Sequence, residues 1–307
     1  MQPKIMINSR EAFNDMIESR LLYRGTKRNE LSEKTSRITY GKVPLIRFSI
    51  FEDHPELTAA FTTRLGGVSK DIFTSMNLSF HRGDDPEAVR ENYRRLGAAL
   101  HIDENRMVFS DQVHQTAIRV VTEEDCGKGI TRDSDITETD GLITDVPGIP
   151  LVTFFADCVP LYIYDPKRPA IALLHSGWKG TVSDIGGEGV RKLQEIYGSH
   201  PEDLLCAIGP SICVNCYEVS ADVAERFTAR YTKEELKTIL FEKEGGKFRL
   251  DLHEAVKANF LRAGVRPEHI LMPDLCTCCN PEFLFSHRAS HGKRGNLAAV
   301  MMLHEKA

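Results

Sequence analysis

Five short apolar runs follow one another between residues 141 and 209, and they constrain the fold more than any other feature. They are the segments GLIT, LVTFF, LYIY, IALLH and LCAIG. Each has the length and the aliphatic and aromatic content of a buried β-strand. Several consecutive strands without intervening helices do not fit a strict alternation of strand and helix. The sequence therefore predicts an α+β fold built as a layered sandwich.

Segments on either side of these runs supply further strands and helices. Strand-like composition occurs in LIRFSIF, LTAAFTTR and AIRVVT. The segment DDPEAVRENYRRLGAAL is typical of a helix, because Asp precedes Pro and Glu in the first turn and apolar residues then recur with a helical period. Three more helices are predicted over 181–197, 220–239 and 251–263.

The first 43 residues differ in texture from the rest of the chain. They are polar and charged, with one short amphipathic helix predicted to begin at Ser9. From Pro44 onward, strand and helix patterns continue without a Pro, Gly or Ser-rich linker. We therefore expect residues 1–43 to form an N-terminal extension and residues 44–307 to form a single catalytic domain.

Composition disfavours several classes of partner. The formal net charge is −5 and the 39 Lys and Arg residues are spread along the chain, so neither a nucleic-acid groove nor an acidic membrane surface is indicated. An apolar run of about 18 residues does not occur, and the first 20 residues lack the apolar core of a secretory signal. We expect a cytoplasmic protein whose eight cysteines are thiols, metal ligands or catalytic groups.

Histidine and cysteine follow three of the strand-like runs. FSDQVHQ contains His114, FADC contains Asp157 and Cys158, and LLHSGW contains His175. Two imidazoles and a thiolate would leave a fourth tetrahedral position of a metal open, where the pKa of a water falls to about 7. Without a metal, Cys158 and His175 could form a nucleophile pair. A buried structural cysteine and ordinary structural histidines are the remaining alternative, because spacing alone does not require these residues to meet.

Anion contacts are predicted nearby. Arg64 precedes Gly66 and Gly67 in FTTRLGGVS, where a guanidinium and backbone amides could hold phosphate, although the motif by itself favours an ordinary turn with a surface arginine. Further candidates for substrate or phosphate contacts are Asn77, Ser176 and Arg288, the last in FSHR at the end of another predicted strand.

Two cysteine-rich segments, CVNC at 213–216 and CTCC at 276–279, suggest a four-cysteine structural zinc site. Taken as C-x-C-C, the second segment departs from the usual C-x-x-C knuckle, which weighs against that interpretation. The nucleotide-binding motifs GxGxxG and GxxxxGK[ST] do not occur, and neither does the PCxxC half of the zinc deaminase signature. An H-x-H pair is also lacking, so a multi-copper electron-transfer site finds little support.

Taken together and in order, eight motifs resemble the YfiH-like proteins, a family also called polyphenol oxidoreductase laccase or laccase domain. They are FTTRLGGVS, MNLSFHRGDDPEAVRENYRRL, DQVHQ, ADCVPL, HSGWKG, IGPSICVNCYEV, DLCTCCN and FSHR. The resemblance runs from about residue 44 to 303. Relatives often carry Tyr where His287 stands, and GR where this chain has RGN at 294–296.

The resemblance implies an α-β-β-α sandwich akin to bacterial deamidase toxins that use a Cys-His pair. It also implies that His114, Cys158 and His175 form one site that holds zinc, with copper as the less favoured metal. Asp157 precedes the cysteine as in the family, and we expect it to serve as a catalytic acid beside this site. By the same comparison, Arg64 is expected to face the pocket.

For function, the resemblance implies phosphorolysis of adenosine, inosine, guanosine or methylthioadenosine, together with adenosine deamination. The partners would then be a small-molecule nucleoside and phosphate, and we expect a monomer or small homo-oligomer. A bacterial branch of the family suggests an alternative, an amidase that edits UDP-linked peptidoglycan precursors by removing misincorporated L-Ser. A binding module without catalysis is the third hypothesis.

Overall fold

Two six-stranded sheets face each other in the computed structural model, which describes residues 19–305. The first sheet has the strand order β16 (Ile270–Leu271), β12 (Leu205–Ile208), β10 (Val159–Asp165), β11 (Ala170–Ser176), β8 (Gly141–Thr144), β7 (Ile118–Val120). The second has the order β3 (Ser36–Thr39), β4 (Leu45–Phe48), β5 (Leu57–Thr62), β17 (Leu297–Leu303), β9 (Leu151–Phe155), β6 (Val108–Phe109). Most neighbouring strands are antiparallel. Four of the five predicted buried runs form β8, β10, β11 and β12 of the first sheet, and the fifth, LVTFF, forms β9 of the second.

Burial on both faces explains why the central strands are apolar throughout. Successive side chains of a strand point to opposite faces. In β11, Ile171 and Leu173 enter the core between the sheets, whereas Ala172 and Leu174 pack toward helices. Strand β17 divides in the same way, with alternate residues in the core between the sheets and in a core beneath a helix.

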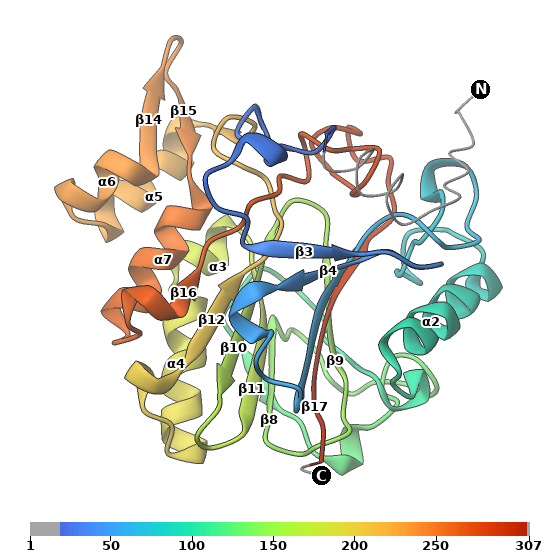
Figure 1. The fold of residues 1–307 in the computed structure, drawn as a ribbon. Helices are drawn as coiled ribbons and strands as arrows, with labels where there is room; N and C mark the ends of the chain where they lie inside the picture. Colours follow the sequence, from blue (N-terminus) through green and yellow to red (C-terminus); the bar gives the residue numbers. More distant parts are fainter. Residues whose placement is uncertain (1–18, 306–307) are drawn as a thin grey trace.

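Helices cover both outer faces of the paired sheets (Figure 1). Helices α3 (Trp178–Val182), α4 (Ile185–Tyr197) and α7 (Leu252–Arg262) lie on the first sheet, and α4 has many contacts with β11. Helix α2 (Pro86–Leu100) packs on the second sheet through Val89, Tyr93 and Leu96. This arrangement confirms the predicted α-β-β-α sandwich. Within residues 19–305, none of the helices combines the length and the apolar character needed to cross a membrane.

Two of the predicted helices are each divided in two. The helix predicted over 181–197 is interrupted at Asp184, which adopts a left-handed conformation and caps α4 by accepting a hydrogen bond from the Gly187 amide. The helix predicted over 220–239 separates into α5 (Ala221–Arg230) and α6 (Lys233–Ile239), because Thr232 and Glu235 form a capping box that begins a new helix. Both helices pack near a small sheet of β13 (Glu218–Val219), β15 (Lys247–Leu250) and β14 (Leu240–Lys243).

The two ends of the chain differ from the sequence-based expectations. Residues 36–39 form an edge strand of the second sheet, and residues 22–27 form a hairpin of β1 (Leu22–Tyr23) and β2 (Thr26–Lys27), so part of the predicted extension belongs to the folded core. Most of the helix predicted from Ser9 lies outside the described residues. The prediction of a strand ending in FSHR was wrong, because residues 281–283 and 287–292 form turns, and the next strand is β17.

Candidate metal centre and adjoining cavity

His114, Cys158 and His175 lie together at one end of the sandwich. One ligand atom from each lies within 4.8 Å of the others. The Sγ of Cys158 is 3.9 Å from Nε2 of His114, and the two imidazole rings are 4.8 Å apart at 85°. His114 comes from the turn between β6 and β7, Cys158 from the turn between β9 and β10, and His175 from β11. Two nitrogens and one sulfur thus converge from three separate segments.

Strand register explains why His175 reaches His114 and Cys158, whereas the adjacent Ser176 does not. In the β10–β11 hairpin, His175 pairs with Pro160 and Ser176 pairs with Val159. His175 shares the inner face of β11 with Leu173, which places its ring between the sheets. Ser176 points to the other face, where its buried hydroxyl bonds to that of Thr181 in α3. The predicted substrate contact of Ser176 is therefore not supported by its position.

Asp140 orients His175 and was missed by the sequence analysis. Its buried Oδ1 lies 2.7 Å from Nδ1 of His175, which leaves Nε2 free to face Cys158 or a metal. The backbone amides of residues 113–115 also donate to the carboxylate of Asp140. One carboxylate thereby fixes the loop of His114 and the ring of His175. An acid directly before the GLIT strand was the only sequence signal.

The electrostatics favour a thiolate at Cys158 and a protonated His175 in the metal-free protein. Burial raises the pKa of the Cys158 thiol, but His175 and His114 outweigh it and lower the pKa to about 6. Burial lowers the pKa of His175, but Cys158 and Asp140 outweigh it and raise the pKa to about 9. A thiolate is the form of cysteine that binds metals and attacks electrophiles.

We expect Cys158 of metal-free protein to react rapidly with iodoacetamide at neutral pH. Because its pKa is about 6, most of it is thiolate at pH 7, and alkylation should slow only as the pH falls through about 6. Burial raises the pKa of Cys126, so this cysteine should already react slowly at neutral pH. Peptide mass spectrometry can follow both residues in one sample. Parallel pH profiles for the two cysteines would contradict this account.

Gly177 leaves the space in which the ligands meet. A Cβ at this position would lie 2.7 Å from Cδ2 of His114 and 3.3 Å from Sγ of Cys158. We expect Gly177→Ala to displace the His114 ring and weaken metal binding at these three side chains by about 10- to 100-fold, with little effect on folding because φ is −75°. Chelator competition measures the affinity, with Gly41→Ala as control because its nearest neighbour is 3.9 Å away. Equal affinities for the two variants would refute the packing argument.

A cavity of about 690 Å³ opens beside the three ligands, within the size range of small-molecule sites. His114, Cys158 and His175 line one end of it. The remaining wall combines aromatic side chains with charged and polar ones, chiefly Phe80, Phe109, Phe154, Arg82, Arg132, Arg294, Ser110, Gln112 and Asn296. Such a wall suits a ligand that has both a flat apolar part and an anionic part.

Arg294 is the most distinctive cation of this cavity. Its Nε is buried and has no hydrogen-bond partner among the described residues. Burial and the nearby charge of Arg82 lower the pKa of Arg294 to about 10, so the group stays charged at neutral pH. Both guanidiniums line the cavity together. An unsatisfied buried donor beside a second cation is well suited to bind an anion.

Asp157 and Arg288 are engaged elsewhere. The carboxylate of Asp157 accepts hydrogen bonds from the Thr277 hydroxyl, at 2.6 Å, and from the Arg288 amide, at 2.7 Å. Asp157 is therefore turned into the loop of residues 277–288 and is not the acid predicted beside the ligands. The Arg288 guanidinium donates to the carbonyls of Cys216 and Glu218. Neither side chain is among those that line the cavity.

Arg64 and Asn77 hold loops together, which corrects the expectation that they face the pocket. The Arg64 guanidinium donates to the carbonyls of Thr74 and Pro281 and lies 4.6 Å from the Phe285 ring centroid. The buried amide of Asn77 donates to Asp84 and accepts from the Asn296 backbone. Their polar atoms are thus satisfied by the chain, and Arg82, Arg132 and Arg294 supply the cations of the cavity.

Comparison with known proteins agrees with the fold. Residues 58–304 match the family model described as multi-copper polyphenol oxidoreductase laccase. "Purine nucleoside phosphorylase YlmD" of Bacillus subtilis is 35% identical over 255 residues, which cover 83% of this chain and 91% of that protein. The crystal structure of the Bacillus licheniformis hypothetical protein YfiH has a TM-score of 0.83 at 34% identity, covering 88% of this chain and all of the other. YlmD from Geobacillus stearothermophilus gives a TM-score of 0.82 at 34% identity, covering 89% and 100%.

Proposed function

The chain belongs to the multi-copper polyphenol oxidoreductase laccase family, and from its site we propose that it is a zinc-dependent purine nucleoside phosphorylase. The substrates would be adenosine, inosine, guanosine or methylthioadenosine, with adenosine deamination as a second activity. The convergence of His114, Cys158 and His175 at the end of a cavity that also contains Arg82 and Arg294 carries this proposal. Relatives named purine nucleoside phosphorylase support it.

The donor set fits zinc with an open position. Two imidazole nitrogens and one thiolate match the ligands of catalytic zinc sites. The hydrogen bond between Asp140 and Nδ1 of His175 leaves Nε2 as the metal-binding nitrogen, the usual support for a histidine ligand. When bound, zinc would act as a Lewis acid that withdraws negative charge from the reacting groups. Copper is the less favoured metal, because a multi-copper site needs more imidazoles.

Phosphorolysis requires phosphate beside C1′ of the ribose and relief of the charge that develops on the leaving purine. One phosphate oxygen forms a bond to C1′ while the C1′–N9 bond breaks, and the purine takes up a proton. Arg82 and Arg294 would hold the phosphate, because the N–H at Nε of Arg294 has no hydrogen-bond acceptor among the described residues. The rings of Phe80, Phe109 and Phe154 would pack against the purine.

One observation favours the amidase alternative. The thiol of Cys158, the imidazole of His175 and the carboxylate of Asp140 interact in that order. Asp140 orients His175, and His175 together with His114 lowers the pKa of Cys158 to about 6. This is the arrangement of a cysteine nucleophile with its base and orienting acid. An amidase acting on UDP-linked amino sugars would use the thiolate directly and would require no phosphate.

Product analysis separates these activities. Purified protein is incubated with adenosine in the presence and in the absence of phosphate, and separately with a UDP-amino sugar carrying an amide-linked L-Ser. Phosphorolysis predicts adenine and ribose 1-phosphate only when phosphate is present, and deamination predicts inosine in either case. Release of serine without nucleoside turnover would overturn the proposal in favour of the amidase. Removal of zinc with a chelator and its restoration provide the metal control.

A further inference from the structure

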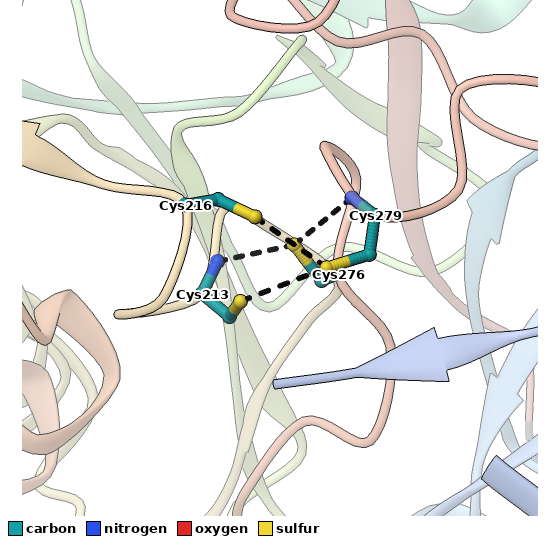
Figure 2. Close-up of side chains that lie close together, drawn as sticks. All are labelled: Cys213, Cys216, Cys276 and Cys279. Atoms are coloured by element: carbon teal, nitrogen blue, oxygen red, sulfur yellow. Dashed lines mark hydrogen bonds between the residues drawn. The ribbon is translucent and has the colours of Figure 1, made fainter. Parts of the chain in front are cut away.

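Four cysteines outside the cavity form a second cluster of potential ligands (Figure 2). The Sγ atoms of Cys213, Cys216, Cys276 and Cys279 all lie within 4.8 Å of one another. Cys216 and Cys279 are separated by 3.4 Å, and Cys213 and Cys279 by 3.9 Å. All four are free cysteines, two of them buried and two half-buried.

The spacing of these cysteines corrects the interpretation of CTCC. CVNC contributes Cys213 and Cys216, and CTCC contributes its first and last cysteines, so each segment contains a C-x-x-C pair. Cys278, which made the segment resemble C-x-C-C, lies outside the set. A pair of C-x-x-C segments joined in space is the ligand pattern of structural zinc sites.

The sulfur arrangement matches a tetrahedral site. A zinc–sulfur bond of about 2.3 Å places the sulfurs of a regular tetrahedron about 3.8 Å apart. The two Sγ–Sγ distances of 3.4 and 3.9 Å lie close to this value. The backbone amides of Cys213 and Cys279 donate to Sγ of Cys276 at 3.2 and 3.4 Å. Amide donors directed at a sulfur stabilise the thiolate form that binds metals.

We propose that Cys213, Cys216, Cys276 and Cys279 bind a zinc ion of their own, separate from the site at His114. Sulfur ligands favour zinc over harder cations. Four protein ligands leave no open position for water, so the role of this ion would be structural. The proposal extends beyond the nucleoside chemistry and does not depend on it.

The position of the cluster indicates what the ion would stabilise. It joins the loop after β12 to the loop before β17, which also meet through the bridge between Ser211 and Cys276 and through hydrogen bonds from the Arg288 guanidinium. Both loops hold Asp157: the Ile212 amide donates to its carbonyl, and the Thr277 hydroxyl donates to its carboxylate. Asp157 has a φ of 96°, which is unusual for a residue other than glycine and needs such support. The four-cysteine ion would thereby hold the turn that presents Cys158.

The β1–β2 hairpin is attached to the same loops. The Cys276 amide donates to the carbonyl of Leu22, and the side chain of Asn280 bonds to both the amide and the carbonyl of Leu22. Asn215 donates to the carbonyl of Arg24. Loss of the ion would therefore loosen the hairpin together with the Asp157 turn.

The test uses protein purified under reducing conditions and elemental analysis of zinc per chain. A His114→Ala/His175→Ala variant removes the other site, and we expect it to retain one zinc whose X-ray absorption spectrum has four sulfur neighbours at about 2.3 Å. Adding Cys213→Ser and Cys279→Ser to this variant should remove that zinc. Adding Cys278→Ser instead is the matched control and should leave the zinc in place, because this thiol is outside the set.

A measurement without cysteine substitutions covers the case in which the serine variants do not fold. Titration of the His114→Ala/His175→Ala variant with a mercurial reagent should release its one zinc as the four thiols react, detected with a zinc indicator. The proposal is overturned if the His114→Ala/His175→Ala variant folds and binds no zinc, or if its zinc has nitrogen or oxygen neighbours. It is also overturned if peptide mapping of freshly purified, unaltered protein finds these four cysteines joined as disulfides.

Discussion

Replacing Cys158 with alanine is expected to lower kcat/KM for nucleoside phosphorolysis by at least about 10³-fold. The substitution removes the only sulfur among the three converging ligands and leaves two imidazoles, which should not retain zinc at the cavity. Activity and zinc content should therefore fall together, with zinc at the four-cysteine cluster unaffected. Steady-state kinetics and elemental analysis on the same preparation give both values.

Cys126→Ala is the control for that experiment. Cys126 is half-buried like Cys158, but its thiol faces Glu123 and does not line the cavity. The Cys126→Ala variant should retain wild-type kinetics and zinc content. Full phosphorolytic activity in Cys158→Ala would show that the reaction takes place elsewhere. Loss of activity with zinc retained would instead point to Cys158 as a nucleophile and favour the amidase hypothesis.

Arg294→Met is expected to raise the KM for phosphate by about 10- to 100-fold, the loss expected for a charge-assisted hydrogen bond. Methionine preserves much of the apolar stem but removes the guanidinium, whose buried Nε lacks a partner among the described residues. The KM for the nucleoside should change much less. Initial rates at varied phosphate, with nucleoside saturating, measure the effect.

Lys293→Met is the matched control for Arg294→Met. Lys293 is the preceding residue in the same loop, but it is exposed and does not line the cavity. Lys293→Met should leave the KM for phosphate and the KM for the nucleoside unchanged. An unchanged KM for phosphate in Arg294→Met would exclude this arginine from the phosphate site and return attention to other cations of the cavity.

The layers of the fold could be predicted because central strands buried on both faces have an unmistakable composition. GLIT and LVTFF correspond residue for residue to β8 and β9. Strand β17 could not be recognised with the same ease, since its run LAAVMML contains a single β-branched residue and suits a helix as well as a strand. Its place at the centre of the second sheet depends on pairing with β5 and β9, which are distant in sequence.

The convergence of His114, Cys158 and His175 could be predicted because each lies at or after the end of a strand and carries an uncommon side chain, and the family resemblance links them. The contributions of Asp140 and Arg294 could not be predicted, because an Asp before a strand and an Arg in a loop are ordinary features. Arg64 had the more suggestive sequence context, beside two glycines. Its guanidinium is used by the carbonyls of Thr74 and Pro281, a role that only tertiary structure reveals.

The central claim is tested most directly by incubating inosine in phosphate buffer, with ³¹P nuclear magnetic resonance to detect phosphate and ribose 1-phosphate and ¹H nuclear magnetic resonance to detect inosine, hypoxanthine and free ribose. Inosine cannot be deaminated at C6, so this substrate isolates phosphorolysis from the second proposed activity. The account predicts that ribose 1-phosphate and hypoxanthine form in equal amounts, and that neither forms without phosphate or in the Cys158→Ala variant. Formation of free ribose, or unreacted inosine in the presence of phosphate and zinc-loaded protein, would contradict it.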